Sequence, residues 1–268
     1  PGRFDMRIHV DMPTATDREA ILRGYLGKVK NSLSDSDIKL LVAYTQGTTP
    51  AHISRAMLTD ACRFAIFDKR LAINRNDMER GLLEQQLGLE NPISEWNEEQ
   101  RRQVAFHEAG HAVAIATLMP DQTIVCATIR RRGGALGFVL PVQTEATYAV
   151  PLDYFKRNII VGLAGFAAAE LTMGKPWSGA SEDYKLVQGN LWAYYQNGGF
   201  GVPLINDPDK LGGDMKKRLD EFLKESQEAA TTLVTFHRAA VERVAAALLE
   251  HGTIGGDEVL ALVERAEP

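Results

Sequence analysis

Phosphate-binding motifs and long apolar runs are both missing from this sequence of 268 residues. It has no Gly-x-x-x-x-Gly-Lys-Ser/Thr loop to cradle phosphates, and no hydrophobic run followed by acids that could hold magnesium. We therefore do not expect these residues to hydrolyse ATP. No apolar stretch reaches about 18 residues, so neither a membrane span nor a signal peptide is expected within them.

Cysteine is also scarce, and positive charge is not in excess. Cys62 and Cys126 are too few for a disulfide framework, and we expect both to be reduced and buried. The net charge of −5 argues against a nucleic-acid-binding protein, and the arginine triplet at 130–132 is too local to reverse this. With 45% hydrophobic and 24% charged residues, the chain has the composition of a soluble globular protein with room for two domains.

The most informative motif is His107-Glu-Ala-Gly-His111, in a chain with only 6 histidines. Residues 97–119 form a predicted helix with Asn97 as N-cap and Pro120 as stop, which places both histidines on one face. Such a pair can share one metal ion, and Glu108 beside it can take a proton from metal-bound water whose pKa is lowered to about 7. This pattern is typical of zinc peptidases. The alternative is a pair of hydrogen-bonded core histidines, but the small Ala109 and Gly110 favour close approach of a second element.

Two histidines leave a zinc site short of at least one protein ligand. No histidine follows His111 until His237, so carboxylates are the better candidates: Glu145, Asp153, Glu170, Glu182 and Asp183. Glu170 lies in a predicted apolar helix, residues 158–173, where a buried acid needs a partner. Asp183 lies where a new helix opens, and there it can equally compensate the helix dipole. Spacing alone does not choose among the five.

Four blocks, taken in order, resemble the FtsH family of ATP-dependent zinc proteases. They are His107-Glu-Ala-Gly-His111, Ala135-Leu-Gly137, Ala164-Gly-Phe-Ala-Ala-Ala-Glu-Leu171 and Ser178-Gly-Ala-Ser-Glu-Asp183. The family blocks read HEAGH, A-L-G, G-G-R-A-A-E-E and T/S-G-A-x-x-D, and the final Asp is the third zinc ligand. The resemblance implies that His107, His111 and Asp183 hold one Zn²⁺ and that Glu108 is the general base.

The N-terminal part resembles the same family. Pro1-Gly-Arg-Phe-Asp5 is similar to the R-P-G-R-F-D segment of AAA+ ATPases, which implies that Arg3 reaches toward a neighbouring subunit's nucleotide. The motif's other arginine would precede Pro1, so we expect the chain to be a fragment. The segment 47–52 departs from the family's G-x-x-G-A-D, which leaves open how this part senses nucleotide.

Four helices are predicted in this N-terminal part, and they resemble the small helical lid of an AAA+ module. A capping box at Thr16–Glu19 opens the first, Ser34 to Asp37 caps the second, and Thr49-Pro50 starts a third whose apolar stripe includes Ile66. The fourth covers residues 76–87. Pro92 then interrupts the helical pattern, which divides the chain into a lid at 1–90 and a protease domain at 94–268.

Beyond the motif helix, residues 123–130 and 135–142 are the two predicted strands. Pro141 places the second strand at a sheet edge, where it could pair with an extended substrate; a small stabilising hairpin is the compatible alternative. Residues 214–250 show one long helical pattern, in which His237 and His251 are surface or capping residues. Gly252 ends it, and a short last helix follows.

The expected fold is therefore mainly α (α+β), with a helical lid followed by a largely helical zincin-type protease domain with a small β element. The resemblance implies a membrane-anchored, homo-hexameric, ATP-dependent zinc metalloendopeptidase that degrades unfolded or membrane proteins. ATP and Mg²⁺ would be needed only by the full-length protein, and membrane contact would come only from segments outside this soluble piece, which faces the cytoplasm, stroma or matrix.

The alternatives are a zinc-free pseudoprotease serving as an unfoldase or assembly scaffold, and a regulatory AAA+ interaction module in which the motif helix is structural. The complete H-E-x-x-H pattern argues against the pseudoprotease.

Overall fold

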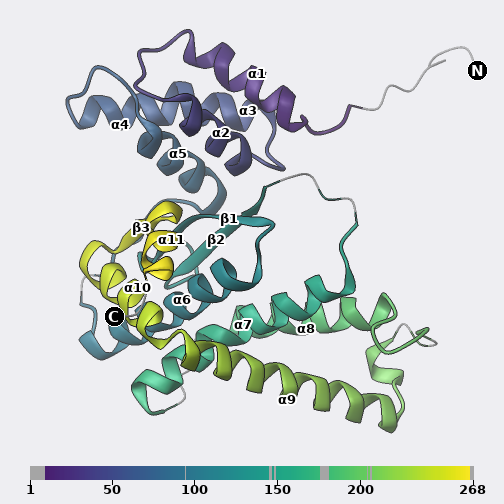
Figure 1. Cartoon of the computed structure of the whole chain (residues 1–268). Coiled ribbons are helices and arrows are strands. Elements are labelled where there is room, and N and C mark those ends of the chain that lie inside the picture. The colour runs from purple at the N-terminus through teal and green to yellow at the C-terminus, as the bar shows by residue number, and fades with distance from the viewer. Residues whose placement is uncertain are drawn as a thin grey trace, which may run out of the picture. The chain divides into compact units, whose positions relative to one another are not determined.

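The computed structural model describes residues 10–93, 95–144, 147, 149–175, 181–203, 205 and 207–265. The chain divides into two compact units, Pro1–Leu89 with Gln143–Ala146 and Glu90–Val142 with Thr147–Pro268. Helices dominate both units, and one small sheet accompanies them (Figure 1). The predicted mainly α fold with a small β element is confirmed. None of the described helices combines the length and the apolar character needed to cross a membrane.

The first unit is a group of short helices. They are α1 (Ala15–Leu26), α2 (Asp35–Tyr44), α3 (Pro50–Arg55), the π-helical segment η1 (Ala56–Ala61), α4 (Cys62–Phe67) and α5 (Arg75–Leu87). The helix α2 begins at the predicted capping box, in which Ser34 and Asp37 bond each other's backbone N–H groups. The segments α3, η1 and α4 follow one another without a break, so the predicted third helix is present.

Two predictions for the first unit are wrong in detail. The capping box of α1 is formed by Thr14 and Asp17 instead of Thr16 and Glu19. Two capping patterns overlap here, and Glu19 instead pairs with Arg23 at 2.9 Å. Ile66, expected in the apolar stripe, is 72% exposed. The π-helical segment η1 explains this, because wider turns rotate every later side chain around the helix axis.

The second unit is built around α6 (Glu98–Leu118). Asn97 caps it as predicted, accepting a hydrogen bond from the Glu99 N–H. Every residue from Val104 to Ile115 is buried, so this helix lies inside the unit with neighbours on all sides. Its neighbours include α7 (Leu152–Met173), α10 (Arg238–His251) and the first strand.

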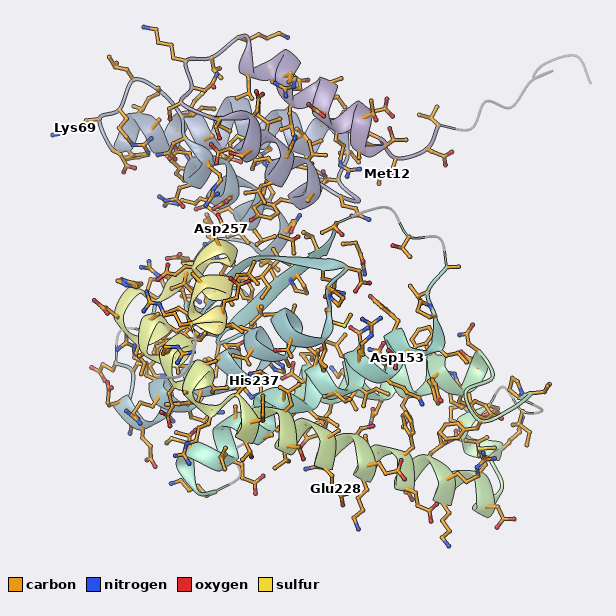
Figure 2. All side chains as sticks on the ribbon, in the orientation of Figure 1. Met12, Lys69, Asp153, Glu228, His237 and Asp257 are labelled. Atoms are coloured by element: carbon orange, nitrogen blue, oxygen red, sulfur yellow. The ribbon has the colours of Figure 1, made fainter. Side chains whose placement is uncertain are left out.

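The other helices of this unit are α8 (Ser181–Gln196), α9 (Gly213–Phe236), α11 (Gly256–Glu264) and the short 3₁₀ segment η2 (Pro208–Lys210). Both α8 and α9 run beside α7 (Figure 1). The predicted helix 214–250 is interrupted at His237, where Figure 2 shows this residue at the junction of α9 and α10. The backbone at His237 has left the helical region (φ −98°, ψ 24°), which lets α9 follow α7 while α10 packs on α6.

The sheet has the order β2-β1-β3, with β1 at Gln122–Thr128, β2 at Phe138–Gln143 and β3 at Thr253–Gly255. Strands β1 and β3 are antiparallel, and Cys126 lies opposite Gly255. The prediction that the strand containing Pro141 lies at an edge is confirmed. Sequence reasoning missed β3, because three residues are too few to show a period of two.

Candidate metal centre

The two motif histidines lie side by side in the middle of α6. Their rings meet edge to face with centroids 4.6 Å apart, and the two Nε2 atoms are 3.1 Å apart. Both residues are buried, at 8% exposure each. The spacing of four residues therefore places two imidazole nitrogens at one point, as the helical period predicts.

The third predicted ligand, Asp183, lies in the first turn of α8 and reaches the same point. Its Oδ2 is 3.0 Å from His107 Nε2, and its Oδ1 is 3.6 Å from His111 Nε2. Among the described residues, these three are the group of His, Cys, Asp or Glu side chains able to hold an ion. Residues 178–180, which begin the block ending at Asp183, lie outside the part of the chain that the structure describes.

The spacing of the donor atoms fits a zinc ion. In a tetrahedral site with bonds of about 2.1 Å, ligand atoms lie roughly 3.4 Å from each other. The three closest pairs here are 3.0, 3.1 and 3.6 Å apart. Two imidazoles and one carboxylate are also a ligand set that zinc accepts while leaving a position open.

Helix α7 fixes the orientation of both imidazoles. His111 Nδ1 lies 2.8 Å from the Val161 carbonyl oxygen, and because a carbonyl only accepts, this nitrogen carries the proton. His107 is likewise hydrogen bonded to the backbone of Gly165, one turn further along α7. Because Nδ1 of His111 carries the proton, the lone pair on its Nε2 atom is free and points toward His107 Nε2 and the Asp183 carboxylate. Hydrogen bonds of this kind set the histidine tautomer in many metal sites.

Small residues let α7 approach this closely. A methyl group on Gly165 would lie 2.4 Å from His111 Nε2, and one on Gly110 would lie 2.4 Å from the Ala164 carbonyl oxygen. Both distances are shorter than real contacts, so a side chain at either position would force its neighbour to shift: the backbone of α7 for Gly110, and the His111 imidazole for Gly165. Gly110 is part of the motif and was expected to have this role; Gly165 was not, although it lies within the third of the family blocks.

The charges of the site favour an ionised Asp183. Burial raises the pKa of this carboxyl, but the hydrogen bonds and charges of His107 and His111 outweigh burial and lower it. Burial and the neighbouring His111 lower the pKa of His107. For His111, burial also disfavours the charged form, yet Asp183 and Glu108 together raise the pKa. In the metal-free chain, His111 is thus the histidine that binds a second proton more readily, and a metal ion would have to displace that proton.

Glu108 lies against the strand side of the site and is 5% exposed. Burial raises its pKa to about 8, with His111 opposing the shift and Asp183 adding to it. A methyl group on Gly137 would lie 2.8 Å from Glu108 Oε1 and 2.8 Å from the Thr128 carbonyl oxygen. Gly137, the last residue of the Ala-Leu-Gly block, therefore brings the chain just before β2 directly onto this carboxyl.

A cavity of about 690 Å³ opens over these groups. The three ligand candidates and Glu108 line it, together with residues 134–139 and Pro141 beside the edge strand. Its wall is mostly apolar, through side chains such as Val104, Ile115, Leu136, Phe138, Val139 and Leu186. An extended chain lying along β2 would pass over Glu108 and the ligand group.

The other carboxylates weighed as ligands lie elsewhere. Asp153, at the start of α7 (Figure 2), pairs with Arg157 at 3.0 Å, and Glu182 pairs with Lys185 at 2.6 Å. Glu170 was expected to be a buried acid in need of a partner; this is wrong, because it lies on the exposed side of α7. Glu145 lies outside the described residues, as does Arg3, the residue expected at a subunit interface.

Comparisons with known proteins show what the sequence around this site is similar to. Residues 94–191, which contain all four site residues, match the model of peptidase family M41. The ATP-dependent zinc metalloprotease FtsH 3 of Symbiobacterium thermophilum is 29% identical over 293 residues, covering 100% of this chain and 46% of that protein. The whole chain is similar to FtsH proteases. Two further relatives named ATP-dependent zinc metalloprotease FtsH match 98% of this chain: those of Thermus thermophilus (29% identical, 45% of its length) and Rickettsia bellii (27%, 44%). The chain thus spans less than half the length of these curated relatives.

Proposed function

We propose that this chain carries the proteolytic part of a zinc-dependent endopeptidase. The observation that carries the proposal is the convergence of His107 Nε2, His111 Nε2 and the Asp183 carboxylate, with the buried Glu108 beside them. The peptidase family M41 match and the names of the relatives support the same activity. In this proposal His107, His111 and Asp183 hold one Zn²⁺ and Glu108 is the general base.

When bound, zinc supplies Lewis-acid chemistry, which acidifies water and polarises a carbonyl group. The chain's residues would do the rest. Glu108 would accept the proton of the attacking water at its carboxylate and pass it to the leaving amine nitrogen. In the metal-free chain, burial raises the pKa of Glu108, which favours uptake of a proton by this carboxylate. The Val161 carbonyl would hold His111 in the tautomer that presents Nε2.

The substrate in this proposal is an extended polypeptide. The cavity runs beside β2, an edge strand, and an edge can pair with an added strand through backbone hydrogen bonds. Such pairing recognises backbone more than side chains, so it suits unfolded chains of many sequences. A folded protein would have to be unfolded before it could lie there.

The whole protein is proposed to be an ATP-dependent protease of FtsH type. Residues 1–90 would be the helical lid of its AAA+ ATPase module, and Arg3 would face a neighbour's nucleotide in a homo-hexamer. ATP and Mg²⁺ would bind to the ATPase part, which these residues do not include, and membrane attachment would also come from other segments. The names of the relatives, which state ATP dependence, support this part of the proposal.

Replacing Glu108 tests the catalytic role. Glu108→Gln keeps the shape of the side chain and removes its basicity, so we expect casein hydrolysis to fall about a hundredfold or more while zinc content stays at one per chain. Glu170→Gln, at an exposed acid on α7, is the matched control and should leave both unchanged. An active Glu108→Gln variant would exclude this residue as the base.

The third ligand is tested within one turn of α8. Asp183→Ala should lower zinc occupancy measured by elemental analysis, because it removes one of three ligands. Glu182→Ala removes the neighbouring carboxylate, which pairs with Lys185, and should keep full occupancy. If Glu170→Ala lowers occupancy and Asp183→Ala does not, the assignment of the third ligand is wrong.

A further inference from the structure

A stacked pair of aromatic rings lies beside the ligand group and has no role in the chemistry above. Phe166 on α7 and Tyr184 on α8 have ring centroids 4.3 Å apart and are inclined by 27°. The Phe166 ring also meets the His107 ring edge to face, with centroids 5.4 Å apart. One aromatic residue thus contacts a histidine of the ligand group, and the other directly follows Asp183 in the chain.

This placement matters because Asp183 comes from a different helix than the histidines. It lies in the first turn of α8, and its side chain is 23% exposed, against 10% for each histidine. The histidines are held from both sides by α6 and α7, whereas the direction of Asp183 depends on how α8 is seated on α7. Val187 packs on Gly162 one turn after Asp183, and the Phe166–Tyr184 stack fixes the residue immediately after it.

Core packing accounts for only one of the two rings. Phe166 is half-buried and packs against the hydrophobic cluster that contains Leu163 and Val187, whereas Tyr184 is 52% exposed and contributes little to the interior of the unit. Ring pairs have preferred separations and inclinations, so a stacked pair on two helices favours one relative placement of the helices at that point.

We propose that Phe166 and Tyr184 are positioning residues for the metal centre, which hold the first turn of α8 so that the Asp183 carboxylate stays within ligand distance of His107. This inference rests on the proposed zinc site. It assigns neither ring a contact with substrate or with the ion. Its consequence is that the position of the third ligand depends on two stacked rings, with centroids 4.3 Å apart, that do not themselves bind the ion.

The test measures metal binding, so that it does not depend on catalysis. Zinc affinity is measured by competition with a chromophoric chelator, and the coordination geometry by the visible absorption spectrum of the Co²⁺-substituted chain. For Tyr184→Ala we expect zinc affinity about tenfold lower and a changed Co²⁺ spectrum, as is usual for groups that orient ligands. Tyr184→Phe keeps the ring and should restore both to the wild-type values.

The matched control is Trp192→Ala. Trp192 stacks on Tyr195 with centroids 5.0 Å apart and an inclination of 26°, so this variant removes a similar ring pair from the same helix but away from the ligands. It should leave zinc affinity and the Co²⁺ spectrum unchanged. The thermal unfolding temperature of each metal-free variant is also measured. A variant that loses zinc affinity but unfolds at the wild-type temperature has lost the geometry of the site and not its fold.

The outcomes separate this inference from the proposed function. Wild-type affinity and spectrum in Tyr184→Ala would overturn the positioning role while leaving the zinc site intact. Equal losses in Tyr184→Ala and Tyr184→Phe would assign the effect to the hydroxyl group and also overturn it. A wild-type chain that binds no zinc would overturn the proposed function and this inference together.

Discussion

The helical side and the strand side of the candidate site are built in different ways. On the helical side, the facing sides of α6 and α7 are buried and in close contact, and two glycines remove the side chains that would separate the helices. On the strand side, residues 138–143 of β2 are all only partly buried, and β2 is an edge strand. The proposed ligands His107 and His111 belong to the first environment, whereas Glu108 faces the second through Gly137.

The difference indicates which function each side serves. A metal site needs ligands fixed within a few tenths of an ångström, and closely packed helices provide this. A general base and a substrate edge must meet a chain that enters and leaves, so a partly exposed strand suits them. We therefore expect substitutions on the two sides to fail in different ways, with metal binding lost on one and turnover lost on the other.

The largest effect is expected at Gly165. Gly165→Ala places a methyl group 2.4 Å from His111 Nε2, and the imidazole, as the end of a side chain, would move away. The metal would then lose a ligand, so zinc affinity should fall about a hundredfold or more, measured by chelator competition. Gly189→Ala on α8 meets no atom within 4 Å and is the control. If Gly165→Ala binds zinc with unchanged affinity, the close packing of α6 and α7 does not fix the position of His111.

The strand side should respond through turnover. Gly137→Ala places a methyl group 2.8 Å from both Glu108 Oε1 and the Thr128 carbonyl oxygen, which displaces the proposed base and the chain just before β2 but touches none of the three proposed ligands. We expect kcat for casein hydrolysis to fall about tenfold while zinc content stays at one per chain. Gly213→Ala, at the start of α9 and free of contacts within 4 Å, should retain activity. Loss of zinc in Gly137→Ala would show that the two sides are not separable.

A dependence on pH should appear in metal binding on the helical side. Asp183 and Glu108 raise the pKa of His111 against the effect of burial, so in the metal-free chain this nitrogen binds a proton more readily than an ordinary histidine. Zinc must displace that proton. Affinity should therefore fall by up to about tenfold per pH unit as the pH drops below the raised pKa, and should level off above it.

Asp183 should add nothing to this dependence near neutrality, because its own pKa is lowered and it is already ionised there. The measurement is zinc affinity as a function of pH. His251→Ala, at an exposed histidine ending α10, is the control and should give the same curve. An affinity that does not change between mildly acidic and neutral pH would contradict the raised pKa of His111.

Much of the site could be predicted from the sequence, because its main parts follow local rules. The helical period places His107 and His111 together, and the cap at Asn97 and the stop at Pro120 bound their helix. The choice of Asp183 over Glu170 needed the family resemblance, since spacing does not report that Glu170 faces outward. Gly165 and Gly137 act through contacts between distant segments, and no local pattern reveals such contacts.

The errors in the fold have the same origin. Ile66 is exposed because a π-helical segment shifts the phase of the helix, and a hydrophobic pattern read with a constant period cannot include that shift. The break at His237 follows from two different packing partners, α7 for α9 and α6 for α10. Neither Pro nor Gly marks it. Tertiary contacts here overrule a helical pattern that would otherwise run on.

The smallest effect is expected where α8 meets α7, at Gly162. A methyl group there would lie 2.7 Å from Val187 Cγ2, the end of a side chain that can rotate, and 3.9 Å from the Asp183 carbonyl oxygen. Gly162→Ala should therefore cost only about 0.5–1.5 kcal/mol of unfolding free energy, the cost of a strained rotamer, with zinc affinity unchanged.

Combining it with Val187→Ala removes the clash, so the two changes should be non-additive and the double variant more stable than their sum predicts. Additive losses would mean that α8 itself has moved, and zinc affinity would then fall with stability, because Asp183 moves with that helix.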